Sequence, residues 1–169
     1  MEIPLHNLPK AGRRFIEQWS TIGVTEASGV RGLRAVEADV VATGDAQRLH
    51  VTGQVSATVE LICSRCLKEF EQPTRTALAL TYALTPETLD EDLDVERLVE
   101  GRVVDPQPEI IGAILSDLPF QTVCSEGCRG LCPQCGADLN LGPCGCPTDT
   151  GSPFAVLKNL QRPPTGGGE

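Results

Sequence analysis

The chain has 169 residues, of which 40% are apolar and 22% are charged, and these values favour a single globular domain over a disordered chain. The formal net charge is −9 without a basic stripe, which argues against tight nonspecific binding to nucleic acid. No apolar run approaches the ~20 residues of a membrane span, and residues 1–10 lack the apolar segment of a secretory signal. We therefore expect a cytoplasmic protein.

The N-terminal segment predicts extended structure followed by one short helix. In residues 1–32, the apolar residues Phe15, Ile16 and Trp19 have a helix-like spacing, so we expect a strand or extended arm followed by a brief helix there.

From Leu33 to Leu84 the apolar residues recur with period two, which indicates strands with one buried face. Apolar residues alternate in 55–62 and again in 77–84, and an earlier strand over 36–42 turns at 43–47 into another around 49–51. These segments predict an antiparallel β-meander or a small barrel-like sheet.

An acidic segment follows the predicted strands. Residues 87–105 contain eight acidic side chains and two arginines, a net charge of −6. The simpler interpretation is a solvated loop, and the functional alternative is contact with a basic partner.

Two segments predict helices that pack on the sheet, which gives an α+β fold. In residues 105–120, Pro108 suits the first helical position and Glu109 the positive end of the helix dipole. An apolar face of five residues follows before Pro119 ends the helix: Ile110, Ile111, Ile114, Leu115 and Leu118. Residues 152–160 predict a second helix, and 161–169 a disordered tail.

The eight cysteines form four close pairs, the spacing expected of a metal-binding protein. Two thiolates a few residues apart can both reach one tetrahedral ion at about 2.3 Å, and a second pair completes its coordination. Four pairs therefore fit two four-cysteine zinc sites. The pairs are Cys63/Cys66, Cys124/Cys128, Cys132/Cys135 and Cys144/Cys146.

Two groupings of these pairs are open. The favoured one joins 63/66 to 124/128 and closes 132/135 onto 144/146, with residues 129–131 as a hinge between two zinc sites. The rival joins 124/128 to 132/135 across a three-residue linker. Loop closure favours neighbouring pairs only weakly.

Other uses of the cysteines are less well supported. Disulfides would require export, and a redox C-x2-C normally sits in a βαβ pattern rather than a meander. Cys128, Cys132 and Cys135 reproduce the C-x3-C-x2-C spacing of radical S-adenosylmethionine enzymes. Only 34 residues follow Cys135, however, which is too few for the barrel that those enzymes need.

The sequence shows no catalytic motif. His6 and His50 are the only histidines and lie near no nucleophile motif, and no glycine-rich loop suits a phosphate. We expect a protein that is not an enzyme, with no small-molecule substrate.

The order of motifs resembles the bacterial YceD family, also described as large ribosomal RNA subunit accumulation proteins. The resemblance covers about residues 30–160 and rests on CSRCL, CSEGCRGLCPQCGADLN and SPFAVLKNL. It implies one YceD-like domain over 1–160, with 124–146 as a cysteine-rich zinc-binding part. Some members keep a CSRCL-like segment and ligands near positions 124 and 128 but lack the later pairs, which also favours the first grouping. Ser116 and Asp117 depart from the family's apolar residues, which implies a more exposed helix end.

The resemblance implies a role in producing or stabilising large-subunit ribosomal RNA, and because the sequence shows no catalytic motif we expect this role to be noncatalytic. The partner would be a large-subunit assembly intermediate, through a ribosomal protein and through ribosomal RNA, and Arg65 and Arg129 are candidates for phosphate contacts. The alternative is a thiol-redox or zinc-delivery protein that serves a ribosomal partner.

Overall fold

The computed structural model describes residues 1–5, 8–9, 11–24, 29–86, 97–99 and 101–147. Its main sheet has five strands in the order β2-β3-β4-β5-β6. All neighbours in it run antiparallel except β5 and β6, which are parallel. Its bounds are β2 (Arg13–Ile22), β3 (Val30–Gly44), β4 (Arg48–Ile62), β5 (Glu69–Ala83) and β6 (Arg97–Leu98). A second sheet pairs β1 (Ile3–Pro4) with β7 (Val103–Val104), and the helix α2 spans Gln107–Ser116.

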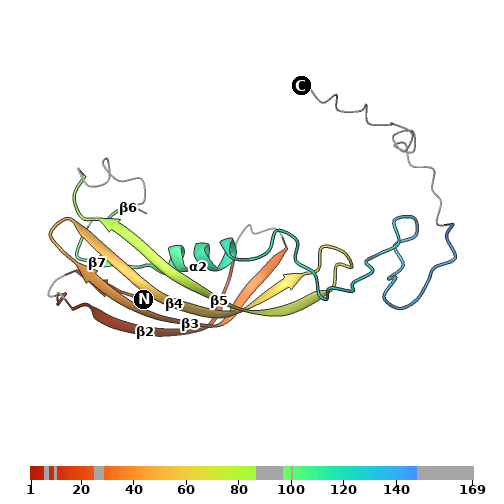
Figure 1. Cartoon of the computed structure of the whole chain (residues 1–169), viewed down its shortest axis with the longest axis horizontal. Helices are drawn as coiled ribbons and strands as arrows, with labels where there is room; N and C mark the ends of the chain where they lie inside the picture. The colour runs from red at the N-terminus through yellow and green to blue at the C-terminus, as the bar shows by residue number, and fades with distance from the viewer. Residues whose placement is uncertain (6–7, 10, 25–28, 87–96, 100, 148–169) are drawn as a thin grey trace, which may run out of the picture.

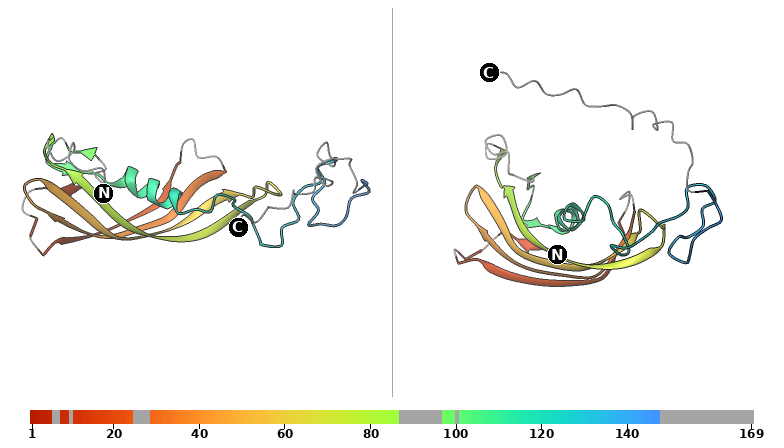
Figure 2. Two further views of the ribbon diagram at one scale, coloured as in Figure 1. Left: turned by 45° about the horizontal axis from the view of Figure 1, so that its top comes forward. Right: turned by 45° about the vertical axis from the view of Figure 1, so that its right-hand side comes forward.

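The predicted meander is confirmed as the strongly curved sheet of β2 to β5, and α2 lies along its concave face (Figures 1 and 2). Alternate residues of β4 face the helix side and are buried, including Val51, Val55, Val59 and Leu61. Since successive side chains of a strand point to opposite faces, the intervening residues form the opposite, convex face. One apolar face is therefore enough to explain the period-two pattern.

The helix packs on β5 and β4 through Ile110 and Ile114, which are fully buried. Its first turn is held by Asp105, whose Oδ1 accepts from the N–H of Gln107 at 3.1 Å. Glu109 accepts from Nε of Arg97 at 2.7 Å and so links the helix to β6. The prediction of a helix here is confirmed, with its start one residue before Pro108 and with Ser116 and Asp117 exposed at its end.

The brief helix expected around Phe15 and Trp19 is wrong, because both residues belong to the ten-residue strand β2. Phe15 pairs with Val40 and Trp19 with Val36 in β3, and both are half-buried on the concave face. A spacing of four residues places two side chains on one face of a strand as well as of a helix. Pairing with β3 is what makes this segment a strand rather than a helix.

Two local features adapt the strands to the curvature. A β-bulge between Arg34 and Glu37, with Ala35 at φ +47°, shifts the buried positions from odd-numbered Leu33 to even-numbered Val36 and those after it. Gly53 of β4 lies opposite Val40, and a Cβ there would be only 2.1 Å from the backbone oxygen of Asp39. The close approach of these backbones therefore requires glycine.

The convex face is polar and carries paired charges. Arg14 contacts Asp39 through both Nε and Nη2 at 2.6 and 2.5 Å, and Arg34 contacts Glu60 at 2.5 Å. No described element covers this face (Figure 2). None of the described helices has the length and apolarity to cross a membrane. The predicted helix 152–160, the tail 161–169 and most of the acidic segment lie outside the described residues.

Candidate metal centre

The cysteines gather at one end of the curved sheet, where the β4–β5 hairpin meets the chain that follows α2 (Figure 1). Residues 63–68 form the hairpin turn. Thr122 fixes the returning chain beside it, since its Oγ1 donates to the carbonyl of Ile62 and its carbonyl accepts from the N–H of Ser64. We call residues 63–68 and 122–147 the cysteine end.

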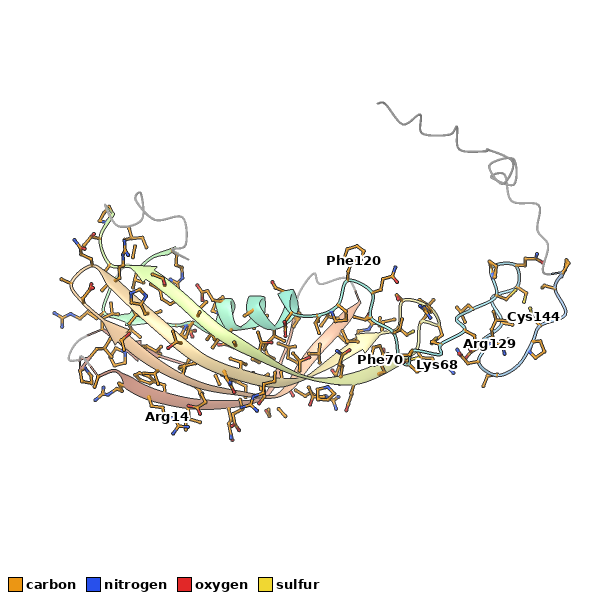
Figure 3. All side chains as sticks on the ribbon, viewed as in Figure 1. Arg14, Lys68, Phe70, Phe120, Arg129 and Cys144 are labelled. Carbon is orange, nitrogen blue, oxygen red and sulfur yellow. The ribbon has the colours of Figure 1, made fainter. Side chains whose placement is uncertain are left out.

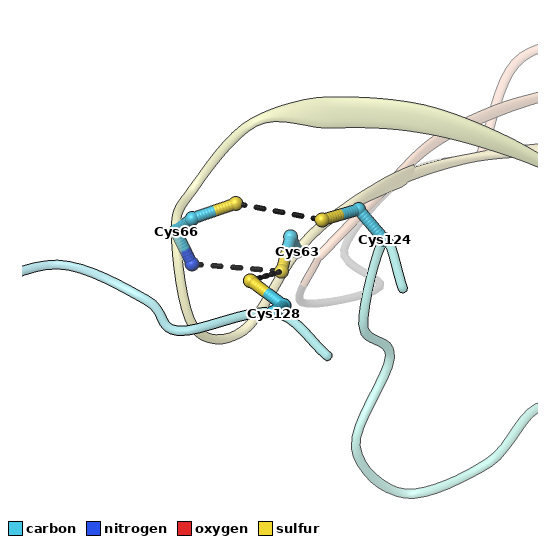
Figure 4. Close-up of side chains that lie close together, drawn as sticks. All are labelled: Cys63, Cys66, Cys124 and Cys128. Atoms are coloured by element: carbon cyan, nitrogen blue, oxygen red, sulfur yellow. Dashed lines mark hydrogen bonds between the residues drawn. The ribbon is translucent and has the colours of Figure 1, made fainter. Parts of the chain in front are cut away.

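The first tetrad consists of the two hairpin cysteines and the two that follow α2, which are Cys63, Cys66, Cys124 and Cys128. The Sγ atoms of Cys63 and Cys128 are 3.8 Å apart, and those of Cys66 and Cys124 are 3.6 Å apart (Figure 4). All four Sγ atoms lie within 4.8 Å of one another. Three of these cysteines are buried and Cys124 is exposed.

The second tetrad consists of Cys132, Cys135, Cys144 and Cys146, whose Sγ atoms also lie within 4.8 Å of one another. It is more accessible than the first, because only Cys132 is buried, Cys144 and Cys146 are half-buried and Cys135 is exposed. An isolated antiparallel β-bridge between Leu131 and Asp138 closes the turn that contains Cys132 and Cys135.

The C-x2-C segments of the two tetrads have the same backbone form. The N–H of Cys63 donates to Lys68 and that of Cys132 to Ala137, five residues on in each case. Four residues after the first cysteine, Leu67 and Gly136 have φ of +61° and +72° and donate to the carbonyls of Cys63 and Cys132. Each turn thus points its two thiols to one side, which is what two ligands of one ion require.

Backbone groups and neighbouring sulfurs shift the pKa values within each tetrad. Burial opposes ionisation of Cys63, but backbone N–H groups of Cys124, Cys66 and Arg65 outweigh it and lower its pKa to about 6. The N–H groups of Cys135 and Gln134, chiefly, lower the pKa of Cys132 to about 6.

The opposite shift occurs at one thiol of each tetrad. Hydrogen bonds with neighbouring thiols, chiefly with Cys66, raise the pKa of Cys124 to about 12. A hydrogen bond with Cys135, together with burial, raises the pKa of Cys146 to about 12. The neighbouring thiols of one tetrad therefore differ in pKa, and a bound cation would favour the thiolate form of all four.

Both tetrads suit a tetrahedral metal ion. Ligand sulfurs at about 2.3 Å from a tetrahedral centre lie about 3.8 Å apart, close to the 3.6 and 3.8 Å measured in the first tetrad. A disulfide would require about 2.05 Å. Four thiolates fill the coordination of such an ion, so the donor set suits a structural rather than a catalytic site.

The structure brings together the cysteine pairs in the grouping that the sequence favoured. Cys128 belongs to the first tetrad, whereas Cys132 and Cys135 belong to the second. The C-x3-C-x2-C spacing therefore does not describe one cluster of ligands.

The two candidate arginines differ in their surroundings. Nη1 of Arg65 donates to the carbonyl of Cys128 at 3.1 Å, so this side chain helps to hold the first tetrad. Arg129 is exposed, and its backbone N–H donates to Oδ1 of Asn140 at 2.8 Å (Figure 3).

Sequence reasoning missed three polar residues around the tetrads, namely Lys68, Asp138 and Asn140. Nζ of Lys68 lies 2.6 Å from Oδ2 of Asp138, and Nδ2 of Asn140 lies 3.6 Å from Sγ of Cys128. In the sequence, residues 137–143 indicate only turn formers. The segment ADLN within the family motif was the one available signal.

Comparison with known proteins places the chain in a family. The model of the large ribosomal RNA subunit accumulation protein YceD matches residues 51–161, which include all eight cysteines. An uncharacterized protein of Mycobacterium tuberculosis is 40% identical over 97 residues, which cover 55% of this chain and 46% of the relative. An uncharacterized protein of Mycobacterium leprae is 35% identical over 118 residues, covering 67% of this chain and 53% of the relative.

The chain spans about half the length of these curated relatives. No solved structure matches it. Since the family's model covers well over half of the chain, including both tetrads, the protein belongs to the YceD family of large ribosomal RNA subunit accumulation proteins.

Proposed function

We propose that this protein is a noncatalytic, cytoplasmic factor of ribosome biogenesis that supports the accumulation of large-subunit ribosomal RNA. One structural zinc ion in each tetrad holds its cysteine end. The observation that supports this most is the family match over residues 51–161, which contains both tetrads. The match to a family of ribosomal RNA accumulation proteins thus includes the part of the chain that carries both tetrads.

The donor sets favour a role in docking rather than in chemistry. A four-thiolate site leaves no open position for a water or a substrate, whereas catalytic zinc sites keep one. Zinc is the ion that most often takes four cysteines in a tetrahedral structural site, and an iron–sulfur cluster is the rival. Metal analysis of protein purified without added metal separates the two.

The charge of the chain favours a basic partner. The net charge of −9 opposes a broad contact with RNA phosphates, while the segment 87–105 alone carries −6. We infer that a basic ribosomal protein of the assembling large subunit is the main contact. Arg129 is the better candidate for an added RNA contact, because Arg65 already donates to Cys128.

The direct test is depletion of the protein followed by measurement of large-subunit relative to small-subunit ribosomal RNA. We expect large-subunit RNA to fall, and to recover with the natural chain but not with Cys63→Ser/Cys66→Ser. Ser125→Ala, an exposed position between two ligands of the same tetrad, is the matched control. Unchanged RNA on depletion would contradict the proposed role.

Co-sedimentation with precursor particles tests the contacts. Neutralising Asp90, Glu91, Asp92 and Asp94 to amides should release the protein from these particles. Arg129→Ala should weaken the association less. Unchanged sedimentation of either variant would remove that group from the interface.

A zinc-delivery role is the second candidate, and the accessibility of the second tetrad favours it. Three of its four cysteines are exposed or half-buried. Delivery requires rapid exchange of isotopically labelled zinc at this tetrad, whereas a structural role requires slow exchange at both.

A further inference from the structure

The turn between the ligand pairs of the second tetrad contacts the first tetrad. Residues 136–143 connect Cys135 to Cys144, so a metal ion in the second tetrad would fix both ends of this turn. Its Asn140 places Nδ2 3.6 Å from Sγ of Cys128, a ligand of the first tetrad. The side chain is oriented by the N–H of Arg129, which donates to its Oδ1 at 2.8 Å.

Asp138 joins the same turn to the first C-x2-C segment. Its Oδ2 lies 2.6 Å from Nζ of Lys68, and its Oδ1 accepts from Nδ2 and from the backbone N–H of Asn140 at 2.7 and 2.9 Å. The carbonyl of Lys68 accepts from the N–H of Cys63 at 2.9 Å. One carboxylate therefore orients the amide that faces Cys128 and also pairs with the turn that presents Cys63 and Cys66.

The segment between the tetrads is held on both sides, in contrast to the hinge that the sequence suggested. The N–H of Leu131 donates to Arg65 at 3.1 Å, and the carbonyl of Gly130 accepts from Leu139 at 2.9 Å. Gly130 has φ +74°, and a Cβ there would be 3.0 Å from the carbonyl oxygen of Arg65. Residues 130–131, which lead into the second C-x2-C segment, are therefore joined to Arg65 of the first by one backbone hydrogen bond and one close backbone approach.

We propose that the two tetrads are coupled through this turn, so that metal in the second raises the affinity of the first. The inference rests on the proposed metal-binding role. With the second tetrad filled, Asn140 and Asp138 are already in place beside Cys128 and Lys68. With it empty, the turn loses its fixed ends, and ordering it must accompany binding at the first tetrad.

The expected size follows from groups of the same kind. Outer hydrogen-bond partners of metal ligands change affinity by about 10–100-fold, and coupling between two sites is commonly about 5–150-fold. We expect about tenfold. Linkage requires that metal in the first tetrad raises the affinity of the second by the same factor.

The experiment measures zinc affinity of the first tetrad in the full chain, by competition with a chelator. Occupancy is assigned by mass spectrometry of alkylated peptides that contain Cys63/Cys66 or Cys144/Cys146. Cys144→Ser/Cys146→Ser removes the second site, and we expect one bound zinc with an affinity about tenfold lower than that of the first tetrad in the natural chain.

Asn140→Ala and Asp138→Asn keep all eight cysteines and should bind two zinc ions, with a lower affinity at the first tetrad. Leu141→Ala, an exposed residue of the same turn, is the matched control and should have no effect. In the Cys144→Ser/Cys146→Ser background, Asn140→Ala should lower the zinc affinity of the first tetrad much less than in the natural chain, because residues 136–143 are then no longer fixed by metal in the second tetrad.

The outcomes separate the coupling from the metal-binding role. A natural chain that binds two zinc ions, with the first tetrad unaffected by Cys144→Ser/Cys146→Ser and by Asn140→Ala, overturns the coupling alone. A natural chain that binds no metal overturns both.

Discussion

The sheet with its helix and the cysteine end are stabilised in different ways. The concave face of the sheet buries a continuous apolar cluster, in which Leu33, Tyr82, Ile110 and Ile114 are among the fully buried members. Among the described residues of the cysteine end, the buried cluster consists of Cys63, Cys66 and Cys128, and Phe70, Val123 and Leu131 pack against it. Burial of apolar surface can maintain the first region, whereas the described residues of the second bury a much smaller apolar cluster.

This difference implies that the two regions respond to different perturbations. The hairpin Ile62–Glu69 is common to both, because β4 and β5 of the sheet continue directly into the turn that carries Cys63 and Cys66. Metal should therefore order the cysteine end without being required for the sheet, and core substitutions should weaken the sheet without removing the ligands.

Removal of metal is expected to have the largest effect, and only on the cysteine end. Structural zinc in small domains contributes about 10–16 kcal/mol of apparent binding free energy, far more than the few apolar contacts here. After dialysis against a chelator, amide exchange should accelerate across residues 122–147 and remain slow in β3 and β4. Readdition of zinc should restore protection.

The outcome that would contradict this division is loss of protection in the sheet together with the cysteine end. In that case the metal would be part of one cooperative unit. The peptide that covers the β4–β5 hairpin locates the boundary, because its strand residues and its cysteines should respond differently.

A cavity in the core of the sheet tests whether weakening the sheet affects metal binding at the cysteine end. Ile114→Ala removes a fully buried side chain and should lower the free energy of unfolding by about 2–5 kcal/mol in urea denaturation. Ile111→Ala, on a half-buried position of the same helix, is the control and should cost less. Both variants should still bind the same number of metal ions, and a loss of metal in Ile114→Ala would show that the regions depend on each other.

Two glycine substitutions should change the stability of the sheet and helix in opposite directions. Gly53→Ala places a Cβ 2.1 Å from the oxygen of Asp39, which must separate β3 from β4 and should cost about 3 kcal/mol. Gly112→Ala in α2 has nothing within 4 Å of its Cβ and should stabilise by about 0.5–1 kcal/mol. Thermal unfolding of the two variants compares them directly, and a stable Gly53→Ala would mean that the strands can separate there at little cost.

The sequence predicted the strands correctly where apolar residues alternate without interruption. It gave the wrong element where the structure depends on pairing with a neighbouring strand. The alternation in β4 and β5 located both strands and their buried faces, as Val55, Val59 and Leu80 show. Phe15 and Trp19 fit a helix and a strand equally well, so only the partner β3 could assign them. The bulge at Ala35 was equally invisible, because it changes which positions are buried without a glycine or proline to mark it.

For the candidate site, the spacing of the cysteines indicated pairs but not their surroundings. Cys63 and Cys128 are 65 residues apart, and it is the return of the chain after α2 that brings them together. Lys68, Asp138 and Asn140 carry no pattern of their own, because an ion pair or an amide facing a sulfur leaves no periodic signal. Such contacts follow from the packing of two turns, which the sequence does not specify locally.

The smallest expected effect compares the two C-x2-C turns at their equivalent position. Leu67 adopts φ +61° where the second turn has Gly136 at +72°. A non-glycine residue in this region costs about 1–2 kcal/mol, partly offset by the larger entropy of unfolded glycine. Leu67→Gly should therefore tighten zinc binding at the first tetrad by a few-fold, and Gly136→Ala should weaken it at the second. Weaker binding by Leu67→Gly would show instead that this side chain, which is 64% exposed, makes contacts that outweigh its backbone strain. The first turn would then owe its stability to packing, as the sheet does, rather than to metal and backbone geometry alone.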